Sequence, residues 1–153
     1  MANTYTQLNV HVVIAVYGRD NALTKRNRAK IFEYINGTMK GLGLFPLAVN
    51  GFTDHVHLFF SMPPNLTLSK VIQELKANTS KWINQQRLVL GRFCWQEGYG
   101  AFSCSQSHRD NLIKYILDQE THHAKAPFRV EYQKLLDRYD IGYNPAYLFD
   151  FYE

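Results

Sequence analysis

Residues 53–60, TDHVHLFF, are the stretch of this chain that decides its fold. The run is short and rich in β-branched and aromatic residues, which predicts a β-strand. Side chains two positions apart on a strand point to the same face of the sheet. His55 and His57 are therefore expected side by side, at a spacing that lets both imidazoles reach one divalent metal ion. A His-x-His pair alone is more often structural, so its meaning depends on the rest of the chain.

The segments around this strand predict alternating strands and helices. Apolar periodicity, the cap residues Thr24, Thr67 and Ser107, and breaks at glycine and proline mark their ends. The expected strands lie at 8–17, 44–51, 55–60, 93–95 and 99–105, and the expected helices at about 25–40, 68–86, 108–122 and 128–139. Helices packed on a mainly antiparallel sheet indicate an α+β sandwich of the ferredoxin-like (RRM-like) type. An aromatic tail, 142–153, is expected to pack on the body or on a partner.

Length and composition favour one globular domain covering residues 1–153. An excess of 17 basic over 13 acidic side chains gives a net charge of +4, which suits an anionic partner without proving one. No apolar run is long enough to span a membrane, and the first residues lack the pattern of a signal peptide. Cys94 and Cys104 lack metal-binding spacing. These features predict a cytoplasmic protein with reduced thiols and no membrane partner.

A second pair of candidate residues lies in the stretch 112–119, LIKYILDQ. Tyr115 and Gln119 are four positions apart in a helical pattern, so they share one helix face. A phenol and an amide oxygen could thus approach the two-histidine site together. Tyrosine is a weak nucleophile at neutral pH because its ordinary pKa is near 10, and a metal ion or Lys114 could help to deprotonate it. The alternative is a tyrosine that packs at an interface.

These motifs together resemble the single-tyrosine HUH transposases of insertion sequences, the TnpA-type enzymes that include the REP-associated tyrosine transposases. The similarity covers nearly the whole chain. It runs through the segments 5–11, 51–57, 95–102 and 115–119 and the pair His122-His123. The resembled family has the ferredoxin-like architecture that the residue pattern predicts independently.

The resemblance implies an enzyme that cuts single-stranded DNA and transfers the strand. His55, His57 and Gln119 would hold Mg²⁺ or Mn²⁺, and the imidazoles favour Mn²⁺. Tyr115 would attack a DNA phosphate, leaving a 5′-phosphotyrosine and a free 3′-hydroxyl. Because the phosphotyrosine keeps the energy of the broken phosphodiester bond for a later joining step, no nucleotide cofactor is needed. The chain accordingly has no Gly-rich phosphate loop.

The resemblance also implies partners: a second copy of the chain and DNA ends read as hairpins. In such a homodimer the tyrosine helix of one subunit could complete the site of the other. Asp54 could orient a histidine or cap a turn. His122 and His123 could be exposed helix-end residues, metal ligands or DNA contacts. Basic side chains that could contact phosphates, or simply be solvated, are Lys70, Lys76, Arg109 and Lys114.

Two other functions compete with a transposase of a mobile element. One is a domesticated endonuclease with the same chemistry. The other is a nucleic-acid-binding regulator on a ferredoxin-like sheet that has lost catalysis. The presence of His55, His57, Tyr115 and Gln119 argues against the regulator.

Overall fold

A four-stranded antiparallel sheet organises the protein, and its strand order is β2-β3-β1-β4. The computed structural model describes residues 2–18 and 21–152. Its strands are β1 (Asn9–Ala15), β2 (Phe45–Gly51), β3 (His55–Ser61) and β4 (Gly100–Ser103). Its helices are α1 (Lys25–Gly41), α2 (Leu68–Gln86), α3 (Arg109–Leu117), α4 (Gln119–His123) and α5 (Phe128–Arg138), with short 3₁₀ turns η1 (Gln106–His108) and η2 (Pro145–Tyr147).

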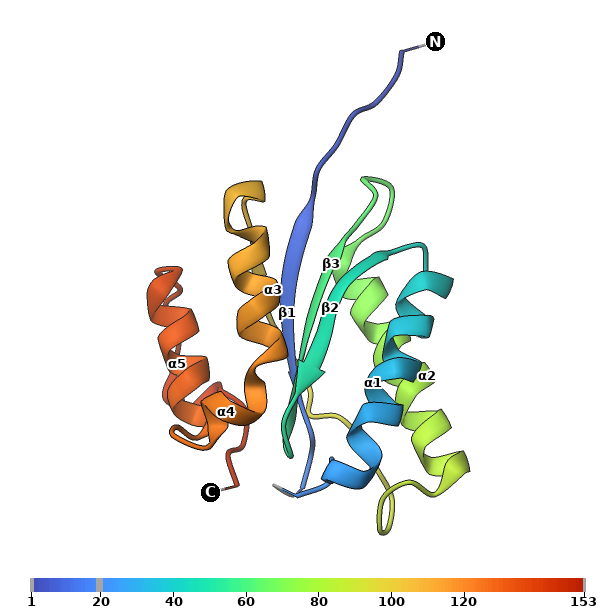
Figure 1. Ribbon diagram of the computed structural model, residues 1–153, viewed down its shortest axis with the longest axis vertical. Coiled ribbons are helices and arrows are strands. Elements are labelled where there is room, and N and C mark those ends of the chain that lie inside the picture. Colours follow the sequence, from blue (N-terminus) through green and yellow to red (C-terminus); the bar gives the residue numbers. More distant parts are fainter. Residues whose placement is uncertain (1, 19–20, 153) are drawn as a thin grey trace.

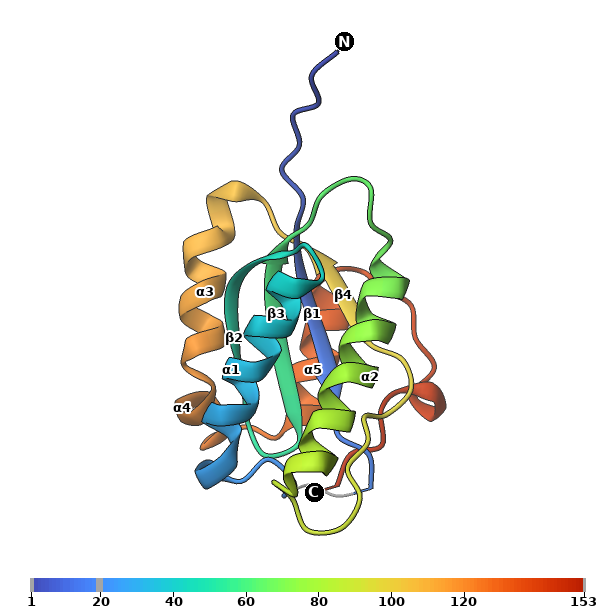
Figure 2. The same cartoon turned by 90° about the vertical axis from the view of Figure 1, so that its right-hand side faces the viewer.

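The helices form a layer on each side of the sheet. Helices α1 and α2 cover one face, and α3, α4 and α5 lie on the other (Figures 1 and 2). The order β1-α1-β2-β3-α2-β4 is the ferredoxin-like arrangement. The predicted α+β class is therefore confirmed.

Strand β3 divides its side chains between the two layers, as a period of two requires. Val56, Leu58 and Phe60 join the main apolar core with α1 and α2. His55 and His57 point to the opposite face, where β1 pairs Val13 with His57. Both histidines are completely buried. The sheet thus separates an apolar layer from a layer that carries polar groups.

One predicted strand does not form. The segment 93–95 makes an isolated bridge between Trp95 and Val16 in place of a paired strand. The reason is a side chain: the amide of Asn84 binds both the N–H and the carbonyl of Phe93, at 2.7 Å and 2.9 Å. These bonds satisfy the backbone groups that a neighbouring strand would otherwise use.

The predicted helix over 108–122 is broken at Asp118. Helix α3 ends at Leu117 and α4 begins at Gln119. The side-chain amide of Asn50 on β2 donates to the carbonyls of Ile116 and Leu117, at 3.0 Å and 3.1 Å. Because these carbonyls have a partner outside the helix, the chain can bend there. Tyr115 and Gln119 consequently sit on two helices.

Helix α5 and the tail pack on the same layer as α3. Phe128 and Tyr132 of α5 are buried with Phe149 of the tail. Gly100 makes this close packing possible, because a Cβ at that position would lie 2.6 Å from the hydroxyl of Tyr132. The expected aromatic tail thus packs largely on its own chain, although Tyr147 is exposed and the last residue, Glu153, lies outside the described residues.

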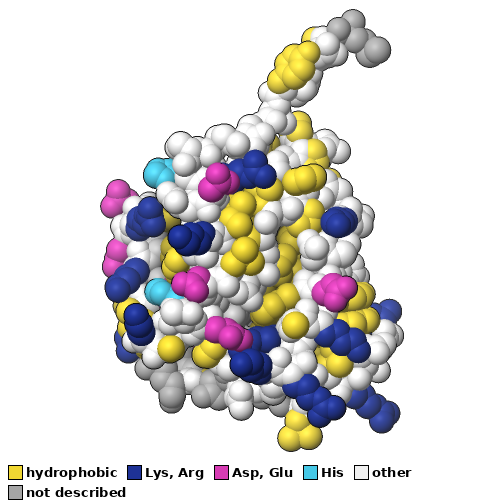
Figure 3. Space-filling model, viewed as in Figure 1, with side chains coloured by type: hydrophobic (Ala, Val, Ile, Leu, Met, Phe, Trp, Pro, Cys, Tyr) yellow, Lys and Arg dark blue, Asp and Glu magenta, His cyan; other side chains and the backbone are white. Residues whose placement is uncertain are grey.

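One edge of the sheet carries exposed apolar side chains. Figure 3 shows hydrophobic side chains in a band down the middle of this face, between α3 and α1, where β2 lies. Phe45 of this edge strand is 66% exposed. Among the described residues, no helix is both long and apolar enough to cross a membrane.

Candidate active site

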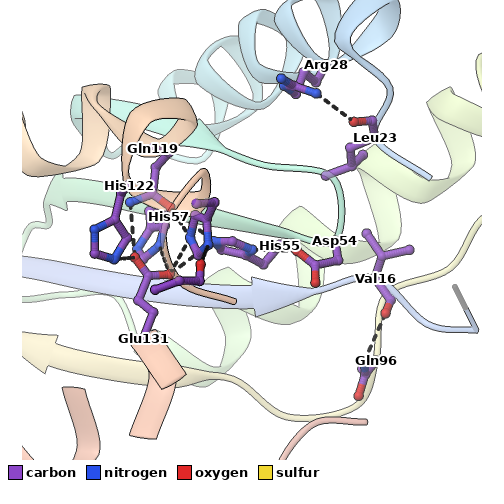
Figure 4. A network of polar contacts seen from close by, with 12 residues as sticks. Val16, Leu23, Arg28, Asp54, His55, His57, Gln96, Gln119, His122 and Glu131 are labelled. Carbon is purple, nitrogen blue, oxygen red and sulfur yellow. Dashed lines mark hydrogen bonds and ion pairs between the residues drawn. The ribbon is translucent and has the colours of Figure 1, made fainter. Parts of the chain in front are cut away.

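The polar layer contains one buried cluster that draws on five elements. Strand β3 supplies His55 and His57, α4 supplies Gln119, and α5 supplies Glu131 (Figure 4). Helix α4 also supplies His123. Strand β1 adds His11 and α3 adds Tyr115, so residues more than a hundred positions apart meet here.

Glu131 occupies the centre of this cluster. Its Oε1 lies 3.1 Å from Nε2 of His55, 3.1 Å from Nε2 of His57 and 3.0 Å from Nε2 of His123. Its Oε2 accepts hydrogen bonds from the Tyr115 hydroxyl and, at 3.1 Å, from the Gln119 amide. One carboxylate oxygen thus faces three imidazoles, and the other faces the tyrosine and, at 3.5 Å, Nε2 of His122.

The outer nitrogens of the two strand histidines also have partners. Nδ1 of His55 lies 2.8 Å from Oδ1 of Asp54, and Nδ1 of His57 lies 2.8 Å from Nε2 of His11. Such outer partners fix the orientation of an imidazole, so that its Nε2 points toward the centre of the cluster. The structure thus places Asp54 where it can orient His55, and His11 does the same for His57.

Burial and charge set the ionisation of the cluster. Burial alone would lower the pKa of His55, but hydrogen bonds to Asp54 and Glu131 outweigh it and raise that pKa to about 9. Burial lowers the pKa of His57. Burial would raise the pKa of Glu131, but His57 and the hydrogen bonds from His123 and His55 hold it well below its usual range. The centre is therefore an ionised carboxylate among imidazoles.

Tyr115 is the other reactive group that the sequence predicts. Burial and the negative charge of Glu131 raise the pKa of its phenol. Its ring meets that of His57 edge to face at 6.0 Å between centroids. The structure thus brings Tyr115 to the histidines of its own chain, in its protonated form.

The spacing of the donor atoms fits one divalent ion. Ligands about 2.1 Å from an ion and at right angles to each other are about 3 Å apart. Nε2 of His55 lies 3.1 Å from Oε1 of Gln119 and 3.1 Å from Oε1 of Glu131, which in turn lies 3.1 Å from Nε2 of His57. Two imidazoles, an amide oxygen and a carboxylate form a donor set that suits Mn²⁺ or Mg²⁺.

The four basic residues predicted to contact DNA fall in two places. Lys70 and Lys76 lie on α2, across the sheet from Tyr115. The Lys76 ammonium donates to the carbonyls of Gln96 and Gly98, so it holds a loop. Arg109 and Lys114 lie on the tyrosine helix itself, α3.

The sequence-based prediction missed Glu131 and His11 and assigned no firm role to His123. Glu131 stands four residues after Pro127, where an acidic residue in a first helical turn is ordinary. His11 could have been found from the sequence, because it lies on the strand next to β3 and its side chain points to the same face of the sheet as His57. His123 lies four residues after Gln119, one helical turn away, and its Nε2 is 3.1 Å from the Gln119 oxygen.

The chain is similar to known proteins in both sequence and fold. The sequence profile of the family described as "Transposase IS200 like" matches residues 4–119. No curated protein sequence matches the chain. Two solved structures are similar in fold, each with a TM-score of 0.59. One is a protein of Deinococcus radiodurans R1 described as a putative transposase, with 19% identity over 78% of this chain and 95% of that chain. The other is a REP-associated tyrosine transposase bound to a REP hairpin, with 13% identity over 80% of this chain and 73% of that chain.

Proposed function

Because this chain belongs to the IS200-like transposase family, we propose that it cuts and rejoins single-stranded DNA with Tyr115 as the nucleophile. The observation that carries this proposal is the meeting of Tyr115 with the buried cluster of His55, His57 and Glu131 in one chain. A phenol held against a site for a divalent ion suits phosphoryl transfer to tyrosine, because the ion can stabilise the charge on the phosphate while the phenol attacks.

The reaction is an exchange of one phosphate ester for another. The phenolic oxygen of Tyr115 forms a bond to phosphorus as the bond from phosphorus to the 3′-oxygen of the preceding nucleotide breaks. The phenol loses its proton and the released 3′-oxygen gains one, so the products are a 5′-phosphotyrosine and a 3′-hydroxyl. Attack by a 3′-hydroxyl on the phosphotyrosine reverses the step and joins strands. No nucleotide cofactor is consumed.

The residues proposed to hold the metal are His55, His57 and Gln119, and the donor spacing adds Glu131. When bound, Mg²⁺ or Mn²⁺ supplies Lewis-acid stabilisation of charge on the phosphate. Asp54 and His11 fix the orientation of the two strand imidazoles through their outer nitrogens. Oε2 of Glu131 accepts the hydrogen bond from the Tyr115 hydroxyl. The phenolic proton therefore points toward Glu131, which leaves the lone pairs of the phenolic oxygen open to attack phosphorus.

A homodimer and hairpin-shaped DNA ends belong to the same proposal. The exposed band along β2, with Phe45, supports a second copy of this chain as the partner, since an unpaired edge strand with apolar side chains favours association. The REP-associated relative is bound to a hairpin. We also treat residues 1–153 as one catalytic domain, because Glu131 of α5 lies beyond the profile match and still reaches the site.

A covalent trapping assay tests the reaction. Single strands from the DNA that flanks the gene, labelled at the 5′ or the 3′ end, are incubated with protein and Mn²⁺ and run on a denaturing gel. Only the fragment 3′ of the cut should migrate with protein, and Tyr115→Phe should abolish this adduct while it leaves the fold intact. Omission of Mn²⁺ should abolish it as well.

The same assay separates the rival functions. Binding of these strands with no cleavage under any metal would favour a regulator. An adduct that persists in Tyr115→Phe would assign the nucleophile to another tyrosine. Cleavage without strand joining would favour an endonuclease over a transposase.

A further inference from the structure

A cleft of about 720 Å³ opens directly beside the nucleophile, between α3 and α5. One wall comes from α3 and the turn before it: Tyr115 lies at the inner end of α3, Leu112 and Asn111 follow outward, and His108 of η1 comes last. Leu112 and Asn111 stand three and four positions before Tyr115, so these three residues share one helix face. The wall therefore leads away from the reactive hydroxyl along a single line.

The opposite wall is the matching face of α5. Glu131 lies at its inner end, and Lys134, Leu135 and Arg138 follow at three, four and seven positions, with Tyr139 just beyond the helix. The face of α5 that places the Glu131 carboxylate in the site thus also places the cationic side chains of Lys134 and Arg138 farther out along the cleft. Helix α5 lies beyond residues 4–119, the part that the family profile matches, so this wall is a feature that the profile does not describe.

The charge of the cleft suits an anion. Lys134 and Arg138 are both exposed, and neither forms an ion pair with any of the residues that the structure describes. Among the side chains that line the cleft, the carboxylate of Glu131 is buried and already bonded to histidines. The two cations therefore face the opening without a neutralising partner.

An aromatic ring stands at the outer end of the same cleft. Tyr139 stacks on Phe102, with ring centroids 4.8 Å apart and planes 27° from parallel. Tyr139 is 38% exposed, whereas Phe102 is buried. A ring fixed from behind and open in front is a platform on which an unpaired base can stack.

We infer that this cleft binds a short run of unpaired nucleotides next to the scissile phosphate, with phosphates at Lys134 and Arg138 and a base on Tyr139. The inference rests on the proposed function, because it places the strand by reference to Tyr115. It identifies the occupant as single-stranded, since cations along one wall combined with one stacking ring match a flexible strand with exposed bases. Arg109 and Lys114 of α3 do not line the cleft, so the inference assigns its phosphate contacts to α5.

Binding without cleavage tests this cleft. Fluorescence anisotropy with labelled oligo(dT) is measured in the Tyr115→Phe background, with chelator present, over a series of salt concentrations. Lys134→Gln and Arg138→Gln should each weaken binding and each reduce the slope of log affinity against log salt by about 0.7, the value for one phosphate contact on a single strand. Lys40→Gln, an exposed lysine on α1 across the sheet, is the matched control and should change neither quantity.

Two aromatic variants test the stacking platform. Tyr139→Ala should weaken binding about tenfold, whereas Tyr139→Phe, which keeps the ring, should bind as the parent does. Equal thermal melting of the variants shows that they fold alike. Slopes and affinities of Lys134→Gln and Arg138→Gln that match Lys40→Gln would overturn the inference, as would equal affinity for a duplex of the same length.

The binding test of the cleft and the trapping assay of the cleavage reaction can fail independently of each other. If the cleft variants lose binding as stated and no adduct ever forms with intact Tyr115, the cleft stands and the proposed chemistry fails. If the adduct forms but the cleft variants bind oligo(dT) like Lys40→Gln, the chemistry stands and the cleft is wrong.

Discussion

The two faces of β3 are buried to the same degree but differ in chemistry, because one is wholly apolar and the other carries two histidines beside the apolar Phe59. Val56, Leu58 and Phe60 meet α1 and α2 with no exposed surface, and His55 and His57 meet α4 and α5 with none either. Apolar burial stabilises the fold in proportion to area. A buried cluster of charged and polar groups returns little net stability, because desolvation offsets the attraction. The difference suggests that one face holds the protein together and the other serves chemistry.

The largest effect is expected on the apolar face. Phe60→Ala removes a completely buried ring and should lower the free energy of unfolding by about 3–5 kcal/mol, measured by urea denaturation. Tyr5→Ala, which removes a ring at an 87% exposed position ahead of β1, should stay within about 0.5 kcal/mol of the parent. Folded Phe60→Ala should still bind Mn²⁺. Loss of binding without loss of stability would contradict the division between the faces.

On the polar face, Glu131→Gln should act mainly on metal affinity. The change keeps the shape and removes the negative charge that faces four imidazoles. Loss of an outer partner of a metal ligand typically weakens binding by roughly 10–100-fold, and loss of a charged ligand should exceed this. Calorimetric titration with Mn²⁺ measures the difference. Glu74→Gln on α2, an exposed position across the sheet, is the control. If the two variants bind Mn²⁺ equally well, Glu131 is not a ligand.

A smaller effect is expected at Asp54, which touches only the outer nitrogen of His55. Asp54→Asn keeps an acceptor there but removes the charge, so Mn²⁺ affinity should fall by about tenfold, at the lower end of the range for such partners. The same calorimetric titration applies. A loss as large as that of Glu131→Gln would mean that Asp54 binds the ion itself.

The smallest expected signal comes from mixing subunits. The structure brings Tyr115 to the histidines of its own chain, whereas the family resemblance favours a tyrosine helix shared across a dimer. If the site is shared, His57→Ala and Tyr115→Phe should together regain activity after exchange, up to about a quarter of the parent cleavage rate, since half the dimers are mixed and each holds one complete site. No recovery in a mixture shown to exchange would place the whole site in one chain.

Much of the fold was predictable because it depends on local pattern. The bounds of α1 and α2 agree with the predicted helices within a residue or two, since a helical period is written into every few residues. The placement of His55 and His57 on one face needed only the strand period of two. The prediction that Tyr115 and Gln119 lie together is correct despite the break at Asp118, since both side chains donate to the same oxygen of Glu131.

Local sequence patterns thus predict the helices, most of the strands, the shared face of the two histidines and the candidate nucleophile. Only the folded chain shows that Glu131 lies against His57, 74 residues away in sequence, and that Asn50 and Asn84 bind the backbone near Asp118 and Phe93. The difference arises from the distance along the chain over which each effect acts. Periodicity and capping act between neighbours along the chain, whereas a buried carboxylate or amide takes its role from whichever polar groups the completed fold brings within hydrogen-bonding distance.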